Sequence, residues 1–511
     1  MDKTNQRPLA KRQLSDISRA STSRPGKKTV VKEEDQTKKK VQSNATKHDT
    51  KNDKTILNQY GSRRKLQKEL LFSMQNLYRV DLYAISAGEE PVDFTYEISQ
   101  QDSVEQKELS TSMGILTITQ NSMKLQIMPP TSGTFEIMLF ARPAYTSEKY
   151  SWVCSFLVEC NEPKTSENRP ENPYLYWGIT QGAEDLGIKP SMYYSEAILL
   201  NNGSYELVLQ TSRPLMMLCE INHKDLDETL AKRCLATQIE GDKLTCSVLC
   251  PYIGFYNLSV FVKDYDSDWN RFHNVGNFLL HCTGNPINLD QLFPPDLSYF
   301  CGPGIRTDKA GLIKFSHTAP IVNTQQGKCN ITFQNQEDLD LLAILNHNKE
   351  QSGHSLSQHV FFTYNGTKVT LSVALPLPGI YKLSLYGKNS SSQELNLLCD
   401  FILQNSSETS WPPFPYTFTS WKKGSVLFEP HSGVLKPLCW VPFRVRVPGA
   451  HRVIVLGEQH VELQINESHI WEGEVFTGNM KQIKLAASQE EISDQMDILI
   501  CFDVLKQQNE I

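Results

Sequence analysis

The chain has 511 residues, of which 39% are hydrophobic and 21% charged, with a formal net charge of −6 and twelve cysteines. This length predicts several domains, and the cysteines are too sparse for a small disulfide-dense scaffold. No stretch approaches the roughly 18 to 20 apolar residues of a membrane-spanning helix, and the amino end has no signal-peptide core, so a cytoplasmic protein without a membrane span is expected.

Residues 1–62 are predicted to form a disordered basic tail. The first 65 residues hold 18 Lys and Arg against 7 Asp and Glu, and a segment so poor in apolar residues cannot offset the entropy of ordering its chain. Ser15 and Ser21 closely follow basic residues, so both are candidate phosphorylation sites. The tail lacks interleaved aromatic residues and the remaining chain is acidic, which argues against specific nucleic-acid binding.

Helical spacing follows the tail. Leu66, Leu70, Met74 and Leu77 recur at intervals of three and four residues, which predicts a short amphipathic helix over residues 63–77. It is expected to dock on the first domain, with contact to a partner or a membrane surface as the alternative.

One phrase then occurs three times along the chain. It consists of a proline-containing turn, a glycine, an aromatic residue two positions later, and apolar residues on alternate positions. The glycines, which lie 121 and 125 residues apart, and their aromatic partners are Gly133, Gly254, Gly379, Phe135, Tyr256 and Tyr381. Since these intervals are as long as whole domains, the repeat indicates several domains of one kind.

The runs around each phrase alternate apolar and polar residues, which is typical of half-buried strands. Short strands with Pro and Gly turns and no long helices predict β-sandwiches. In such a sandwich Tyr256 and Tyr381 suit a tyrosine corner, in which the ring is buried and the hydroxyl bonds back to the backbone. Phe135 cannot make that bond, so the first domain must differ there.

The predicted fold is therefore all-β, with tandem Ig-like antiparallel sandwiches behind the tail. The predicted sandwiches cover residues 78–160, 172–284, 293–404 and 412–505. The fourth is a variant with altered turns, marked by Trp421, Gly449 and Trp471.

Three features together resemble one known family. They are the run Tyr174-Leu175-Tyr176-Trp177-Gly178, the Pro-x-x-Gly-x-Tyr strands, and the pattern from Trp421 to Gly478. Over roughly residues 78–505 the chain resembles the carboxyl-terminal portion of the kyphoscoliosis peptidase and hillarin family, which joins a transglutaminase-like core to Ig-like domains. The resemblance implies a cytoskeletal or muscle-associated protein.

The catalytic core of that family has no counterpart in the sequence. Such a core needs a thiolate, a histidine and an orienting acid, within a domain on the order of 100 residues. Before residue 78 there is no cysteine and only one histidine, His48, and the first cysteine is Cys154 in a predicted strand. A protein without enzymatic activity is therefore expected.

Metal and cofactor sites are not expected either. Cys246 and Cys250 share one face of a strand, where cysteines usually pack in the core, and no zinc-ligand spacing accompanies them. His354 and His359 lie in a polar loop and are expected to be solvated. The sequence also has an acidic loop with Asp264, Asp266 and Asp268, but Trp269 stands where a calcium loop needs glycine.

The function predicted from these features is a scaffold that binds proteins through sandwich edges and the grooves between domains. Cytoskeletal filament or crosslinking proteins are the candidate partners. Two alternatives remain open. The chain could be a residual member or regulator of a transglutaminase-like cysteine peptidase family. It could also be a cell-surface adhesion protein, in which sequons such as Asn257-Leu258-Ser259 would carry glycans.

Overall fold

The computed structural model describes most of the chain from residue 55 onward. The described residues are 55–57, 69–74, 80–86, 91–101, 113–119, 122–129, 131–144, 146–161, 169–189, 197–267, 271–349, 356–389, 394–421, 424–490 and 495–506. The predicted tail apart from residues 55–57, with Ser15 and Ser21, lies outside them. Within the described ranges, no helix is both long and apolar enough to cross a bilayer.

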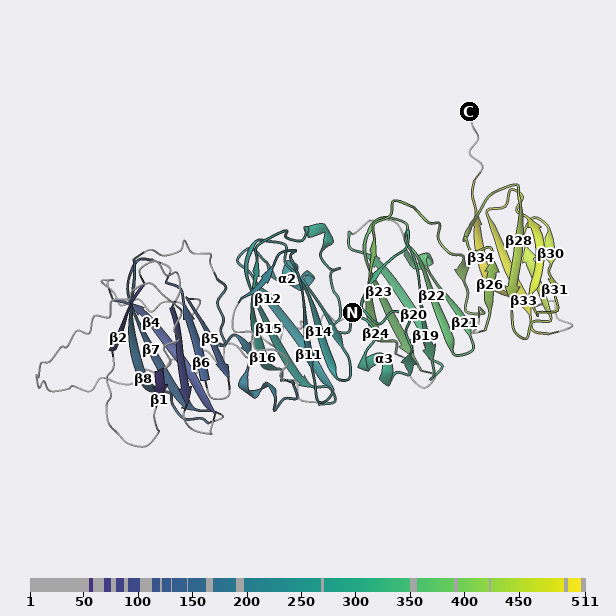
Figure 1. Ribbon diagram of the computed structural model, residues 1–511. Helices are drawn as coiled ribbons and strands as arrows, with labels where there is room; N and C mark the ends of the chain where they lie inside the picture. Colours follow the sequence, from purple (N-terminus) through teal and green to yellow (C-terminus); the bar gives the residue numbers. More distant parts are fainter. Residues whose placement is uncertain are drawn as a thin grey trace, which may run out of the picture.

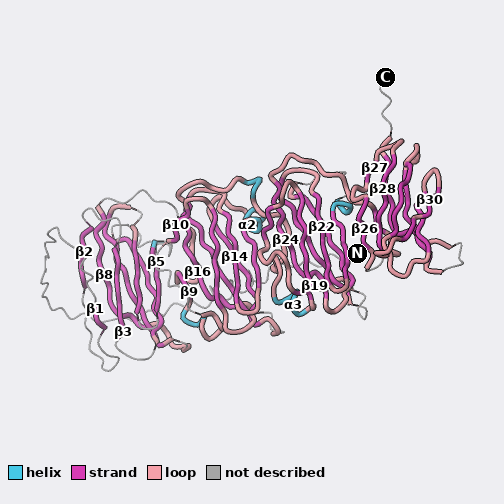
Figure 2. Tube along the Cα trace, turned by 45° about the vertical axis from the view of Figure 1, so that its right-hand side comes forward, coloured by secondary structure: helices cyan, strands magenta, loops and turns pink. Residues whose placement is uncertain are grey.

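Four antiparallel β-sandwiches lie in a row and form an elongated molecule, as Figure 1 shows. The tandem Ig-like all-β fold predicted from the sequence is confirmed. Helices are few and short within the described residues (Figure 2). They are α2 (Glu228–Arg233), α3 (Ile305–Lys309) and the 3-10 turns η2 (Gln181–Ala183), η3 (Leu289–Gln291) and η4 (Leu356–His359).

The first sandwich consists of one sheet in the order β2-β8-β7-β4 and a second in the order β1-β3-β6-β5. Apolar residues at alternate positions form the buried face of these strands. In β4, for example, Val92, Phe94, Tyr96 and Ile98 are buried on one face. The bounds are β1 (Thr55–Leu57), β2 (Glu69–Met74), β3 (Val80–Ser86), β4 (Val92–Gln100), β5 (Gly114–Thr119), β6 (Ser122–Ile127), β7 (Gly133–Pro143) and β8 (Ser151–Cys160).

The second sandwich pairs the sheet β10-β16-β15-β12, joined by β9, with the sheet β11-β14-β13. Its strands are β9 (Gly178–Ile179), β10 (Ile198–Leu200), β11 (Ser204–Gln210), β12 (Leu215–Asn222), β13 (Leu235–Ile239), β14 (Lys243–Leu249), β15 (Gly254–Asp264) and β16 (His273–Cys282).

The third sandwich has the sheets β18-β24-β23-β20 and β17-β19-β22-β21. Its strands are β17 (Leu312–Ile313), β18 (Ile321–Asn323), β19 (Lys328–Asn335), β20 (Asp340–His347), β21 (Val360–Asn365), β22 (Lys368–Ala374), β23 (Gly379–Lys388) and β24 (Asn396–Asn405).

The fourth sandwich has a larger sheet, β25-β34-β33-β29-β30 with β27 beside β34, and the sheet β26-β28-β32-β31. Its strands are β25 (Tyr416–Thr417), β26 (Val426–Glu429), β27 (Val434–Leu435), β28 (Trp440–Arg446), β29 (Arg452–Leu456), β30 (His460–Glu462), β31 (Gln464–Ile465), β32 (Trp471–Phe476), β33 (Gln482–Ser488) and β34 (Asp497–Val504).

The repeated phrase opens the same strand in each of the first three sandwiches. Gly133, Gly254 and Gly379 begin β7, β15 and β23 at φ values of 140°, 126° and 138°, which favour glycine because it has no Cβ. Each strand pairs with the last strand of its sandwich, and each pairing contains a bulge six residues after the glycine. The phrase therefore encodes one local structure three times.

The predicted helix over residues 63–77 is wrong, because residues 69–74 form the strand β2. β2 lies parallel to β8, the last strand of its sandwich, as β10 lies parallel to β16 and β18 to β24. An open edge of β8 would leave its backbone groups unpaired, and β2 satisfies them. The first sandwich thus begins before residue 78, and residues 55–57 of the predicted tail also pair in it, with β3.

The sandwiches stack by the faces of their sheets, and the strands run across the long axis of the molecule (Figures 1 and 2). This stacking explains why residues 255–262 of β15 are all buried, whereas the equivalent strand β7 buries alternate residues only. β15 is covered on one side by its own sandwich and on the other by the preceding linker and domain. β7 belongs to the sandwich at the end of the stack.

Candidate functional site at the domain junctions

The tyrosine corners form in the second and third sandwiches as predicted. The rings of Tyr256 and Tyr381 are fully buried. The Tyr256 hydroxyl donates to the carbonyl of Tyr252 and accepts from its N–H, both at 2.8 Å. Tyr381 makes the same pair of bonds with Leu377, at 2.8 and 3.2 Å. These corners hold the turn against the strand that follows it.

A polar side chain from the neighbouring strand lies next to each phrase glycine, and this feature was not predicted. His347 Nε2 lies 3.3 Å from the carbonyl oxygen of Pro378, and Gln100 Nε2 donates to the carbonyl of Ser132 at 3.4 Å. His223 occupies the equivalent position in the second sandwich, stacked on Tyr256 at 4.3 Å. The signal lay in the sequence, because Gln100, His223 and His347 precede the phrase glycines by 33, 31 and 32 positions.

Trp177 forms the core of the first junction. It lies in the linker, is 4% exposed, and clusters with Ile115 of the first sandwich and with Phe255 and Leu279 of the second. The backbone N–H of Trp177 donates to the carbonyl of Leu116 at 2.8 Å. The linker tryptophan is thereby fixed to both neighbouring domains.

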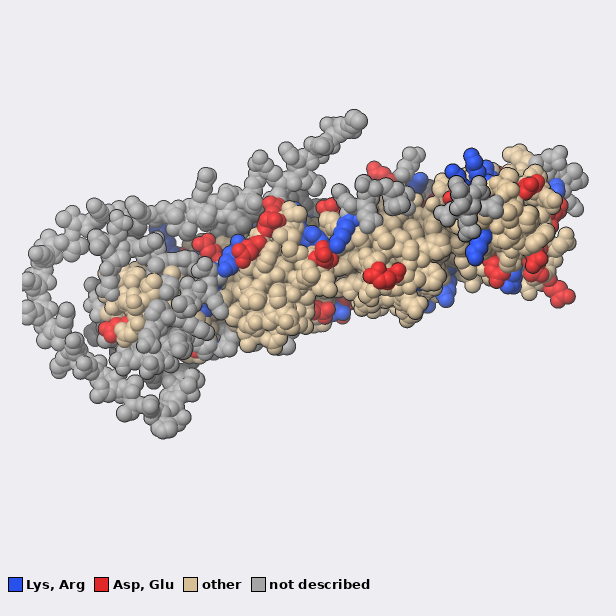
Figure 3. Space-filling view, turned by 90° about the horizontal axis from the view of Figure 1, so that it is seen from above, with Lys and Arg blue, Asp and Glu red and all other residues tan. Residues whose placement is uncertain are grey.

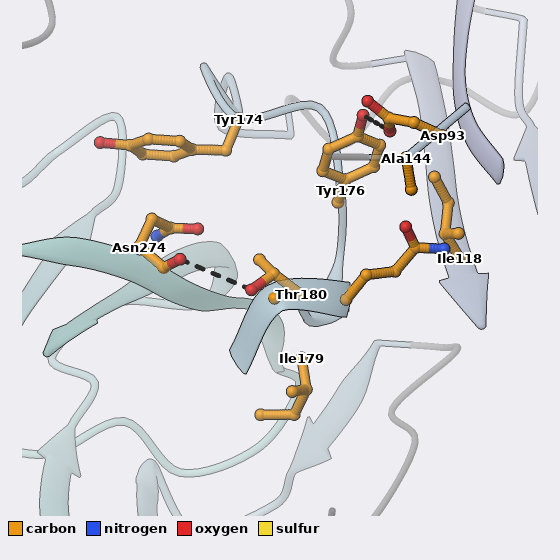
Figure 4. Close-up of a pocket in the computed structure, with 10 residues that line it drawn as sticks. Asp93, Ile118, Ala144, Tyr174, Tyr176, Ile179, Thr180 and Asn274 are labelled. Carbon is orange, nitrogen blue, oxygen red and sulfur yellow. Dashed lines mark hydrogen bonds between the residues drawn. The ribbon is translucent and has the colours of Figure 1, made fainter. Parts of the chain in front are cut away.

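A pocket of about 270 Å³ lies beside this junction (Figure 4). Its polar wall is organised by Asp93, which accepts hydrogen bonds from the hydroxyls of Tyr150 and Tyr176. Asp93 also pairs with Arg142, whose Nη2 lies 3.0 Å from Oδ2. Tyr174 comes from the linker and packs edge-on against Phe261, with ring centroids 5.7 Å apart.

The polar groups of this pocket bind one another and hold the linker to the first sandwich. Both oxygens of Asp93 are occupied by donors from the first sandwich and the linker. Burial, followed by the hydrogen bond to Asp93, raises the pKa of Tyr150 to about 12, and burial also raises the pKa of Tyr176. Both phenols therefore remain protonated donors at neutral pH, and none of the described lining residues is Cys, His or Ser.

The second junction has a larger apolar core. Phe293 and Cys301 of the linker pack between Ala236 of the second sandwich and Ile380 and Ile402 of the third. Phe255 and Ile380 both directly follow a phrase glycine, so the two junctions use one equivalent position.

Polar contacts reinforce the second junction. Gln238 donates to the carbonyls of Pro303 and Thr318, each at 2.7 Å. Asp266 of the predicted acidic loop forms an ion pair with Lys309 of α3, while Asp268 lies outside the described residues. This part of the loop therefore joins two domains.

The third junction is aromatic. Phe361 of the third sandwich lies 5.6 Å from Phe414 and 6.3 Å from Trp421, measured between ring centroids. Trp411 of the linker donates from Nε1 to the carbonyl of Gln326 at 2.6 Å. The ammonium group of Lys328 lies over its ring, at 3.2 Å from the centroid.

The remaining predicted residues lie inside single domains. Phe135 is buried in the first core and Trp471 in the fourth, and Gly449 sits in a turn at φ 72° with open space around it. The structure therefore brings only Trp177 and Trp421 of the predicted set to junctions.

The two cysteines and the described histidine that were considered as metal ligands are buried inside their domains. Cys246 and Cys250 are fully buried, and burial raises the pKa of the Cys250 thiol. The expectation that His359 is solvated is wrong, since it is 8% exposed, bonds through Nδ1 to the carbonyl of Ala374 at 2.6 Å, and has its pKa lowered by burial. His354 lies outside the described residues, among which no group of three candidate metal ligands occurs.

Comparison with known proteins identifies the domains. The profile of the KY-like, immunoglobulin-like domain matches residues 69–171, 185–293 and 309–416, more than half of the chain. The chain belongs to this KY-like family. It is 27% identical over 286 residues to the human protein named kyphoscoliosis peptidase and 26% identical over 285 residues to the mouse one.

These alignments of the KY-like chain are partial. They cover 55% of this chain and 41% of each relative, so the chain spans about two fifths of the length of the curated relatives it matches. The solved structures that are similar include an I-band fragment, I67-I69, of titin, with 9% identity and a TM-score of 0.13 over 67% of this chain and 96% of that one. The insect immune protein hemolin has 12% identity and a TM-score of 0.15, over 87% and 98%. Scores this low support no inference about domain arrangement.

Proposed function

We propose that this KY-like chain is a non-catalytic cytoplasmic scaffold, associated with the cytoskeleton, that holds partner proteins at fixed positions along a stiff row of domains. The observation that carries this proposal is the buried core at all three junctions. Because each linker is packed between its neighbours, binding faces on different sandwiches keep a fixed separation. The cytoskeletal assignment rests on the family resemblance.

The fourth sandwich offers a face suited to a protein partner. Trp440 on β28 is 64% exposed and lies 5.5 Å from Phe476 between ring centroids. Arg444 and Glu472 lie four residues farther along the same face, with Nε and Oε2 3.7 Å apart. Exposed Trp and Arg are over-represented among the residues that dominate binding energy, so this Trp440 face is the favoured docking surface.

Surface charge supports a protein partner over a nucleic acid. Figure 3 shows that Lys and Arg are interspersed with Asp and Glu on the described surface in this view. A phosphate backbone needs a continuous basic field, which this face lacks.

The ionisable groups argue against catalysis in the described domains. Burial raises the pKa of Cys154 to about 11 and those of Cys234 and Cys329 to about 12, so these thiols stay protonated and weakly nucleophilic. Both carboxylate oxygens of Asp93 already accept hydrogen bonds from neighbouring side chains.

The test is affinity capture followed by direct binding. The full chain is immobilised, proteins retained from striated-muscle lysate are quantified, and a purified candidate is titrated against the wild type and Trp440→Ala. Filament or crosslinking proteins should be enriched, and Trp440→Ala should weaken binding by roughly thirtyfold, or about 2 kcal/mol. Trp152→Ala, which removes another exposed tryptophan, is the control and should bind normally. Thiol-dependent peptide hydrolysis by the purified chain would contradict the proposal.

A further inference from the structure

The edge strand β20 of the third sandwich is unusually apolar. Among the described strands it pairs only with β23, so no described strand lies along its other edge. Leu342 and Ile344 point outward and are 42% and 40% exposed. Residues 340–347 contain no Lys, Pro or Gly, although natural edge strands commonly use charges, prolines or bulges to prevent pairing with other chains.

The homologous edges in the same chain are protected by a charge. β4, β12 and β20 pair with the repeat strands in the same register, so Glu97, Glu220 and Ile344 are equivalent residues opposite Met138, Ser259 and Ser384. Each of those three partners lies five residues after its phrase glycine. The glutamate found in the first two sandwiches is thus an isoleucine in the third, and its edge alone has lost the protecting charge.

The sequence of β20 is also symmetric about Ala343. Leu341 and Leu345 lie two positions either side of it, Leu342 and Ile344 one position either side. Asp340 and Asn346 lie three positions away on either side. A two-fold axis through Ala343 would therefore place the apolar residues of one copy opposite apolar residues of the other. It would also place the amide donor of Asn346 opposite the carboxylate acceptor of Asp340.

We propose that β20 pairs antiparallel with β20 of a second copy of this chain, with the two Ala343 residues directly opposite. Leu342 of one copy then contacts Ile344 of the other, and Asn346 donates to Asp340, each twice because of the symmetry. The two sheets become one continuous sheet through main-chain hydrogen bonds, as in other cases of strand addition. The result is an isologous dimer of two rods.

The register follows from the side chains. Shifting the strands by two residues would place Ile344 against Asp340 or Leu342 against Asn346, and an odd shift would put outward against inward faces. The homologous strand β12 cannot pair in this way, because the equivalent axis would set Leu218 against Glu220. The proposal does not depend on the scaffold function.

The first experiment measures mass in solution. Sedimentation velocity of the full chain over a range of concentrations should give twice the chain mass, and Ile344→Glu should give the single mass. That substitution introduces the residue present at the two homologous edges, so the chain should remain folded, and its melting temperature should fall only by the amount that dimerisation contributes. Ile253→Glu, at an apolar position that is 61% exposed outside β20, is the control and should remain dimeric. A wild-type chain that is monomeric throughout would overturn the proposal.

The second experiment reads the register. Directly opposed residues in antiparallel strands have Cβ atoms roughly 4.5–5.5 Å apart, close to disulfide distance. Ala343→Cys should therefore form an intermolecular 343–343 disulfide, identified as a linked peptide by mass spectrometry after mild oxidation. Leu199→Cys, exposed elsewhere, should not. If a dimer exists but Ile344→Glu leaves it intact and no 343–343 link forms, another surface joins the copies and the proposal is wrong.

Discussion

The hydroxyl of Tyr381 joins two backbone groups of Leu377 to the strand that follows them. Tyr381→Phe keeps the buried ring, as Phe135 does in the first sandwich, but removes both hydrogen bonds. We expect the third sandwich to lose about 1–2 kcal/mol of stability, since a net hydrogen bond contributes about 1 kcal/mol. Native-state hydrogen exchange of β23 measures this loss. Tyr416→Phe, at an exposed ring, should change nothing, and equal effects of the two changes would contradict the argument.

His223 makes the second sandwich sensitive to acid. Burial lowers its pKa below the ordinary value of 6.5, with Asp225 opposing that shift and Lys224 adding to it. The unfolded chain therefore takes up the proton first, so stability present above pH 6.5 is lost as the pH falls below it. We expect the melting temperature of the wild type to fall on acidification, and His223→Gln to flatten that dependence.

The reciprocal change is the control for this prediction. Gln100 fills the equivalent position in the first sandwich with an amide that cannot titrate. Gln100→His should give the first sandwich a new acid sensitivity, read by hydrogen exchange of β7 at pH 5 and pH 7.5. An unchanged profile in both variants would show that this position does not govern the pH dependence.

Single residues were predictable where one motif determines the geometry. A Gly-x-Tyr phrase after a turn leaves the hydroxyl few partners besides the turn itself, so Tyr256 and Tyr381 were predicted correctly. The histidines next to the phrase glycines come from a distant strand. Their spacing from the glycines recurs in the sequence, but strand pairing is needed to show that His347 lies opposite Tyr381. His359 was misjudged because the polar sequence around it does not show that its ring is buried and bonded to the carbonyl of Ala374.

At the scale of elements, the strand β2 closes the edge of β8. We expect a chain lacking residues 1–79 to expose that edge and to exchange the amides of β8 much faster, because their parallel hydrogen bonds with β2 are lost. A chain lacking residues 1–54 keeps β1 and β2 and should match the full chain. Hydrogen exchange with mass spectrometry on both chains decides this, and equal protection of β8 in the two would contradict the pairing.

Strands such as β4 and β14 were predictable because one of their faces is more exposed to solvent than the other, which produces a period of two. β2 was not, because its run Leu70-Leu71-Phe72 satisfies a helical and an extended pattern equally well, and the free edge of β8 decided between them. The burial of β15 on both faces was also unpredictable, since its outer cover comes from the preceding domain.

At the scale of the whole molecule, the sequence predicted the number of sandwiches but not their stacking. The segments between the predicted sandwiches are polar or rich in proline, and such linkers normally leave domains free to move. The residues that pack the junctions lie instead at the starts of the predicted sandwiches, Trp177 in 172–284 and Phe293 in 293–404. A few apolar side chains held between two sheets therefore pack each junction.

Trp177 should therefore control the stiffness of the molecule. Trp177→Ala removes the centre of the first junction, and truncating a buried tryptophan typically costs about 3–5 kcal/mol. Because the residue lies between domains, we expect the cost to appear as uncoupling of the first sandwich while the cores remain folded. Small-angle scattering should show a broader distribution of distances, and protease should cut near residues 169–180. Trp440→Ala, at an exposed tryptophan, should leave both measurements unchanged. If Trp177→Ala instead unfolds the second sandwich with no change in flexibility, the tryptophan belongs to that domain's core and the junctions do not determine the shape.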